Sequence, residues 1–137
     1  MREILFRGKR VSDGEWVEGF YAYHKDCWKD RETHRIYKVF CESDCGDFYP
    51  DWYEVDPTTI GQYTGLTDKN GKRIFEGDVV RRKIDSVESR CCYEIRWNNS
   101  FTGYWYYRCS SFMSMMNESC RVVGNIHDNP ELLEETL

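Results

Sequence analysis

The amino-acid sequence predicts an all-β fold: a two-layer sandwich or bent, barrel-like sheet of about seven to nine short strands with one or two short helices. Aromatic residues make up 16% of the 137 residues, and flat rings favour the pleated surface of a strand. Alanine, the strongest helix former, is almost absent. Two tight-turn signals, Asn70-Gly71 and Glu76-Gly77-Asp78, lie close together and predict a β-meander in the middle of the chain.

The N-terminal part of the chain is expected to contain three strands. The first strand covers residues 4–6 and is expected to end at Gly8, because glycine often interrupts a strand. The second, residues 15–23, carries apolar groups on both faces, which predicts contacts on two sides. Residues 25–34 are charged and irregular, so an exposed loop is expected there before a third strand at residues 36–41.

In the rest of the chain, turn and helix-cap residues predict where strands and helices begin and end. Asn70-Gly71 has the composition of a type I′ turn, in which both central residues adopt positive φ. Asp56-Pro57 predicts the start of a turn or helix, and Asn129-Pro130 repeats that order before an acidic tail helix. Residues 81–90 are polar and are expected to form a hairpin tip. The remaining expected elements are strands at 60–63, from Val79, at 91–97, at 101–109 and at 121–126, and helical turns at 112–116.

The length fits a single domain without internal repeats. We expect an N-terminal β lobe at about 1–54, a central meander and C-terminal β lobe at about 55–128, and a tail helix at about 129–137. An SH3-like small barrel over residues 74–126 is the architectural alternative, because a turn, a valine strand, an aromatic strand and a closing strand follow one another there.

Charge and cysteine content restrict the function classes. Nineteen basic and twenty-four acidic residues give a net charge of −5, which disfavours a protein that coats duplex DNA. The basic residues concentrate in residues 1–10 and 69–83, and residues 41–56 are acidic. Seven cysteines without a signal peptide or a membrane-spanning apolar run predict reduced thiols and a cytoplasmic location.

The strongest metal-like pattern is Cys41-x₃-Cys45, with Cys27, His24 and His34 upstream. Structural zinc needs four converging ligands, and paired knuckles at short spacing are its strong signal. The second pair is missing, so we predict no metal site and no cofactor.

No catalytic constellation is visible. The chain has three histidines and lacks a nucleophile elbow or a phosphate-cradling glycine loop. The sequence therefore predicts a protein that is not an enzyme.

The most suggestive cluster for binding is aromatic. Aromatic platforms stack unpaired bases, arginines beside them hold phosphates, and the same side chains anchor protein interfaces. Core packing in a two-layer β fold is the simpler explanation for these rings, but a strand with rings on both faces leaves one face for a second layer, a subunit or a ligand. The candidate binding residues are Trp97, Tyr104, Trp105, Tyr107, Arg96 and Arg108.

Three stretches resemble the YopX family. They are ILFRGKR…GEWVEG in residues 4–19, the central run from Ile60 to Val80, and VVGNIHDNPELL in residues 122–133. The resemblance implies a small, mostly β protein of phages or prophages with no established activity or catalytic residues. The positions that carry the signature, for which we expect structural roles, are Gly61, Gln62, Tyr63, Thr64, Gly65, Asn70, Gly71, Glu76, Gly77, Asp78, Gly124 and Asn125.

Two functions remain open. The first is a non-enzymatic phage or prophage protein that acts as a protein-interaction or accessory module, with an unknown partner or a second copy of itself. The alternative is an accessory protein that binds single-stranded nucleic acid through an aromatic and arginine face.

Overall fold

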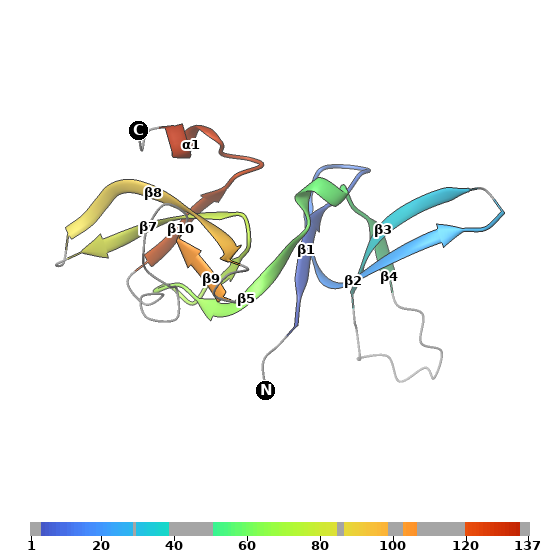
Figure 1. Cartoon of the computed structure of the whole chain (residues 1–137), viewed down its shortest axis with the longest axis horizontal. Helices are drawn as coiled ribbons and strands as arrows, with labels where there is room; N and C mark the ends of the chain where they lie inside the picture. Colours follow the sequence, from blue (N-terminus) through green and yellow to red (C-terminus); the bar gives the residue numbers. More distant parts are fainter. Residues whose placement is uncertain are drawn as a thin grey trace. The chain divides into compact units, whose positions relative to one another are not determined.

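The computed structural model describes residues 4–28, 30–38, 51–84, 87–98, 103–106 and 120–134. These residues form ten strands, a short 3-10 helix and a short α-helix, so the all-β prediction is confirmed (Figure 1). The chain divides into two compact units, Met1–Gln62 and Tyr63–Leu137. No helix in the described part has the length and apolar content needed to cross a membrane.

The first unit is an antiparallel sheet in the order β4-β3-β2-β1, and β1 pairs further with the start of β5. Alternate side chains of these strands point to one face, where Val17, Ile36 and Val55 are almost fully buried and Phe6 and Tyr21 pack against them. The strands are β1 (Phe6–Lys9), β2 (Trp16–Asp26), β3 (Arg31–Lys38), β4 (Asp51–Glu54) and β5 (Gly61–Thr67).

The segment after β4 belongs with these strands. The amide of Val55 donates to the carbonyl of His34, and the amide of Asp56 donates to that of Lys9, both at 2.9 Å. The Asp56 carboxylate accepts from the amide of Thr58 at 3.0 Å and caps the 3-10 helix η1 (Pro57–Thr59), as the sequence predicts. Residues 55–62 are therefore grouped with the N-terminal strands and not with the C-terminal lobe.

Two predictions for the first unit are wrong. Strand β1 does not end at Gly8 but continues to Lys9. Residues 25–34 are not a loop, because β2 extends to Asp26 and β3 begins at Arg31, with a turn between them. Apart from Thr33, which is buried, most residues in this part of the hairpin are exposed, so cross-strand backbone pairing holds it without the apolar alternation that marks a half-buried strand.

The second unit contains a hairpin of β5 and β6 and an antiparallel sheet in the order β10-β7-β8-β9. Ile74, Val80, Ile95 and Cys120 are buried completely in its core, together with Tyr104. This sheet is open, so the described residues between 74 and 126 do not close into an SH3-like barrel. The elements are β6 (Arg73–Phe75), β7 (Asp78–Ile84), β8 (Val87–Asn98), β9 (Gly103–Tyr106), β10 (Cys120–Asn125) and α1 (Glu131–Glu134).

The meander forms, but its first turn differs from the prediction. Gly71 has φ of 81°, whereas Asn70 does not adopt positive φ, so this is not a type I′ turn. The amide of Gly71 donates to the carbonyl of Asp68 at 3.0 Å, which places the turn over Asp68–Gly71 with glycine last. The second turn, at Glu76-Gly77, is confirmed, with φ of 90° at Gly77. The helical turns expected at 112–116 lie outside the described residues.

Candidate functional site

The described members of the predicted aromatic cluster do not all lie on one face of their sheet. Trp97 and Tyr104 lie opposite each other on β8 and β9, with ring centroids 4.9 Å apart, but Tyr104 is only 8% exposed and belongs to the core. Arg96 precedes Trp97 in the strand and therefore lies on the other face, where it pairs with Glu94. Trp105 lies on β9 opposite Arg96, without a described side chain, and Tyr107 and Arg108 are outside the described residues.

The signature residues of β5 have structural contacts. The Thr64 hydroxyl is buried and donates to the carbonyl of Ile74 at 2.7 Å, which joins β5 to β6. The ring of Tyr63 packs against Phe75 at a centroid distance of 5.5 Å. The other signature residues of β5 are Gly61 and Gln62, which pair with β1, and Gly65, which has φ of 87°.

The turn that contains Asn70 and Gly71 is organised by Asp68, which the sequence analysis did not single out. The Asp68 side chain is buried, and one carboxylate oxygen accepts from the amides of Asn70 at 2.8 Å and Lys72 at 2.9 Å. The other oxygen accepts from the amide of Val122 on β10 at 2.9 Å. A single carboxylate thus connects the turn to a strand more than fifty residues away.

The Glu76-Gly77-Asp78 turn is held in a similar way. Asp78 is 1% exposed, and its carboxylate accepts from the amide of Phe75 at 2.8 Å. Burial, with a smaller contribution from the charge of Glu94, raises the pKa of the Glu76 carboxyl above its ordinary value. Gly77 donates its amide to the carbonyl of Ile95 at 2.9 Å.

The last two signature residues, Gly124 and Asn125, shape the turn that follows β10. The Asn125 side-chain oxygen accepts from the amides of His127 at 3.0 Å and Asp128 at 2.9 Å. A Cβ atom on Gly124 would lie 2.5 Å from the side-chain oxygen of Asn129, so a larger residue would displace that side chain. The signature in this unit therefore supplies acceptors and space for the backbone.

A different aromatic set lies on the first unit. Phe20, Tyr37 and Trp52 are direct cross-strand neighbours on β2, β3 and β4, and we call them the ring row. Phe20 is 50% exposed and Trp52 is 44% exposed, so two large rings of the row reach the surface. The ring row is therefore an accessible aromatic strip that crosses three strands.

The alternation of β2 explains why this strip is exposed. Val17 and Gly19 are buried on the core face, so Trp16, Glu18 and Phe20 lie on the opposite face. A Cβ atom on Gly19 would lie only 2.2 Å from the backbone oxygen of Tyr37. Glycine thus permits the close approach of β2 and β3 beneath the ring row.

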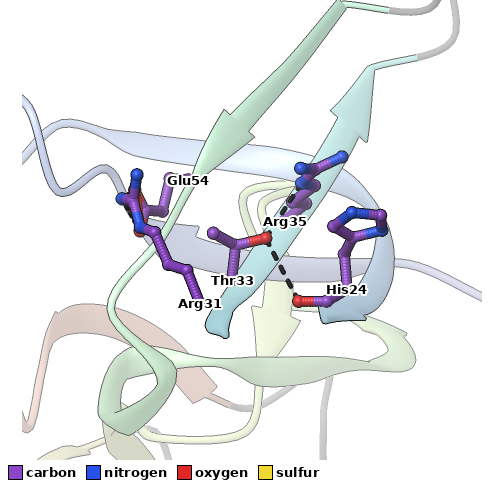
Figure 2. Close-up of polar contacts among 5 residues, drawn as sticks. All are labelled: His24, Arg31, Thr33, Arg35 and Glu54. Carbon is purple, nitrogen blue, oxygen red and sulfur yellow. Dashed lines mark hydrogen bonds and ion pairs between the residues drawn. The ribbon is translucent and has the colours of Figure 1, made fainter. Parts of the chain in front are cut away.

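Arg35 lies next to the ring row and is held in place by three contacts. Its Nε donates to the hydroxyl of Thr33 at 3.1 Å, and Nη1 donates to the hydroxyl of Tyr37 at 3.2 Å. Its guanidinium carbon lies 3.8 Å from the ring centroid of Trp52, a cation–π contact. Figure 2 shows Arg35 beside Thr33, whose hydroxyl also donates to the carbonyl of His24 at 3.4 Å.

Glu54, the cross-strand neighbour of Arg35, forms an ion pair with Arg31. Both oxygens of Glu54 accept from Nη2 of Arg31, at 2.9 and 2.8 Å (Figure 2). Further along the sheet, the Arg7 guanidinium and the Lys9 ammonium lie 4.7 and 5.6 Å from the ring centroid of Trp16. We use the term outer face for this side of the β1–β4 sheet, which carries Arg7, Lys9, Trp16, Glu18, Phe20, Arg35, Tyr37, Trp52 and the Arg31–Glu54 pair.

The residues of the zinc-like pattern have other surroundings where they are described. Nδ1 of His34 lies 2.6 Å from the hydroxyl of Tyr21, whereas Cys27 is exposed at the hairpin turn. Cys41 and Cys45 are outside the described residues. Within the described part of the chain no three histidine, cysteine or acidic side chains gather as a metal site would require.

Sequence reasoning missed the outer face because its rings are far apart in the chain. The available signal was the alternation of β2, which placed Trp16 and Phe20 on one face, combined with the weakly patterned aromatic stretch that contains Trp52. Only strand pairing brings Phe20, Tyr37 and Trp52 into one row.

Comparisons with known proteins concern nearly the whole chain. A family model described as YopX protein matches residues 5–134. The crystal structure of protein EF1440 from Enterococcus faecalis resembles this structure with a TM-score of 0.57 and 23% sequence identity, covering 97% of this chain and 99% of that one. At this identity the likeness concerns the fold alone. A search of curated proteins gave no match.

Proposed function

The chain belongs to the YopX family, and from this premise we propose that it is a non-enzymatic interaction module of the phage or prophage type that works in the cytoplasm. Its working surface is the outer face of the β1–β4 sheet, which binds a macromolecular partner. Glu76 and the other polar signature residues of the second unit are assigned to the framework and not to catalysis.

One observation carries this proposal. The side chains of Phe20 and Trp52 in the ring row are each about half exposed. Covering such apolar surface with a partner removes it from water and stabilises the complex. Trp, Tyr and Arg are also the residues that most often dominate binding energies at interfaces. Arg35 is fixed by its contacts to Thr33 and Tyr37, so little side-chain entropy is lost when it binds.

The test is site-specific photo-crosslinking of the full chain. A photoreactive phenylalanine analogue replaces Phe20 in one variant and Tyr23 in another, in cells that naturally carry the gene. Both positions lie on β2 and are half exposed, but they lie on opposite faces, so Tyr23 is a matched control. We expect a discrete adduct from position 20 that is absent from position 23.

Nuclease and protease treatment then identifies the class of the partner. Equal adducts from both positions, or none from position 20, would contradict the proposal that the outer face is the working surface. A second copy of the chain as the sole adduct would mean that the face serves self-association.

A further inference from the structure

We propose that the partner of the outer face is single-stranded nucleic acid, with unpaired bases stacked on Phe20 and Trp52 and phosphates beside Arg35 and Lys9. This inference rests on the proposed function and names the ligand class of the same face. It differs from the site predicted on β8 and β9, where Tyr104 is buried and Arg96 lies on the other side of the strand.

The ring row has the layout that stacking requires. Neighbouring strands are about 4.8 Å apart, so the positions of Phe20 and Trp52, two strands apart, are separated by about 10 Å. Both rings are about half exposed, and Tyr37 between them is partly buried. Base stacking on such rings tolerates any sequence, because every base presents a flat π surface.

Cations lie beside two rings of this face, and Glu18 lies between Trp16 and Phe20 on β2. The Arg35 guanidinium lies against Trp52, and the Lys9 ammonium lies near Trp16, with both cationic side chains partly exposed. Arg7 is nearly buried, so we assign it to the support of Trp16 and not to phosphate contact.

Local charge favours an anionic partner, although the chain carries a net charge of −5. Glu54, the cross-strand neighbour of Arg35, is neutralised by a two-bond pair with Arg31, and Glu18 is a further acid of the outer face. Arginine and aromatic residues are enriched at protein–protein interfaces, whereas lysine is depleted there, so Lys9 beside Trp16 is the cation that favours a phosphate-bearing ligand. A ligand with alternating phosphates and flat bases satisfies both kinds of group, and the acidic remainder of the chain limits its affinity.

The first measurement is the fluorescence anisotropy of labelled single-stranded DNA and RNA oligonucleotides of about 12 nucleotides, titrated with the full chain. Two phosphate contacts predict that affinity falls about sevenfold between about 50 and 200 mM salt. A duplex of the same sequence should bind more weakly, because its bases are not available for stacking.

Matched variants on the same strands assign the site. Phe20→Ala should weaken binding roughly 5- to 150-fold through the loss of one stacked base, while Tyr23→Ala should leave it unchanged. Arg35→Gln should leave a salt dependence of about threefold over the same range, while Lys38→Gln, on the opposite face of β3, should keep the full dependence.

Failure of this inference is distinguishable from failure of the proposed function. No binding of either oligonucleotide at low salt, equal binding of the duplex, or binding insensitive to Phe20→Ala and Arg35→Gln would each overturn it. If a nuclease-resistant protein adduct still formed from position 20, the outer face would remain an interaction surface, with a protein partner.

Discussion

The two units of this chain use polar side chains in opposite ways. In the second unit Asp68 and Asp78 are buried, and their carboxylates accept from backbone amides. In the first unit Arg35 and the Arg31–Glu54 pair lie on a sheet face beside exposed rings. The buried carboxylates form hydrogen bonds with backbone amides of the chain, whereas the partly exposed cations and rings can still contact a ligand.

The two units also differ in which of them carries the recognisable sequence motif and which carries the exposed binding surface. The YopX-like signature is densest in the turns of the second unit, where geometry demands particular residues. The outer face uses common residue types at separated positions, and it has no contiguous motif. A recognisable sequence motif can therefore reflect a requirement of the fold. The surface available to a partner, by contrast, forms only when the strands pair.

The largest expected effect comes from Asp68→Ala. Three backbone amides, those of Asn70, Lys72 and Val122, would lose their acceptor in a buried position. We expect the free energy of unfolding to fall by about 3–5 kcal/mol, because buried unsatisfied donors are costly. Urea denaturation gives the total, and hydrogen exchange by peptide should place the loss in residues 63–134.

Asp56→Ala is the comparison in the first unit. Its carboxylate also accepts from a backbone amide, that of Thr58, but the site is exposed and water can replace it. The expected cost is about 1 kcal/mol. Equal losses from Asp68→Ala and Asp56→Ala would remove the contrast between the units.

Gly19→Ala tests the platform beneath the ring row. The added Cβ would lie 2.2 Å from the backbone oxygen of Tyr37, and a backbone atom cannot rotate away. We expect a loss of about 2–3 kcal/mol in the free energy of unfolding, with increased hydrogen exchange in β2 and β3.

Gly14→Ala is the control for Gly19→Ala, because it adds backbone strain without a steric clash. Gly14 has φ of 73°, but no atom lies within 4 Å of the added Cβ. Only the strain of the left-handed region remains, at about 1 kcal/mol. A Gly19→Ala protein as stable as Gly14→Ala would mean that β2 and β3 separate without cost.

Glu76→Gln tests whether burial of a carboxyl affects the second unit. Burial and Glu94 raise the pKa of Glu76 in the folded chain, so the folded state holds its proton to higher pH than the unfolded chain does. The contribution of Glu76 to stability is therefore present at low pH and is lost as pH rises from about 4 through the folded pKa. The Tm of Glu76→Gln minus that of the wild type should increase over this range. A constant difference would contradict the raised pKa.

Local chemistry made much of the fold predictable. Asp56-Pro57 and Gly77 act within a few residues, and their cap and turn were foreseen correctly. Residues 25–34 of the β2–β3 hairpin were predicted as a loop because most of them are exposed, so their sequence lacks apolar alternation. The turn at Asn70 was misassigned because the deciding contact comes from the carboxylate of Asp68.

The candidate site was less predictable than the fold. Trp97 and Tyr104 do meet, but strand register also directs Tyr104 into the core. The ring row needs two strand pairings, each with the correct register, to bring Phe20, Tyr37 and Trp52 together. A one-residue change in either register would turn one of these rings to the core face, and the sequence does not fix register to that precision.

The smallest expected effect on stability comes from the Arg31–Glu54 pair, which also gives a sensitive test of the outer face. Arg31 is 62% exposed at its side chain, so Arg31→Gln and Glu54→Gln should each change the free energy of unfolding by only about 0.2–1 kcal/mol. Their effects on oligonucleotide binding should have opposite signs. Arg31→Gln leaves the Glu54 carboxylate uncompensated near Arg35 and should weaken binding, whereas Glu54→Gln frees a cation and should strengthen it. Anisotropy titrations at about 50 mM salt would show both changes, and each should shrink as salt screens the charges. Changes of the same sign would mean that the pair affects the sheet and not the charge of its face.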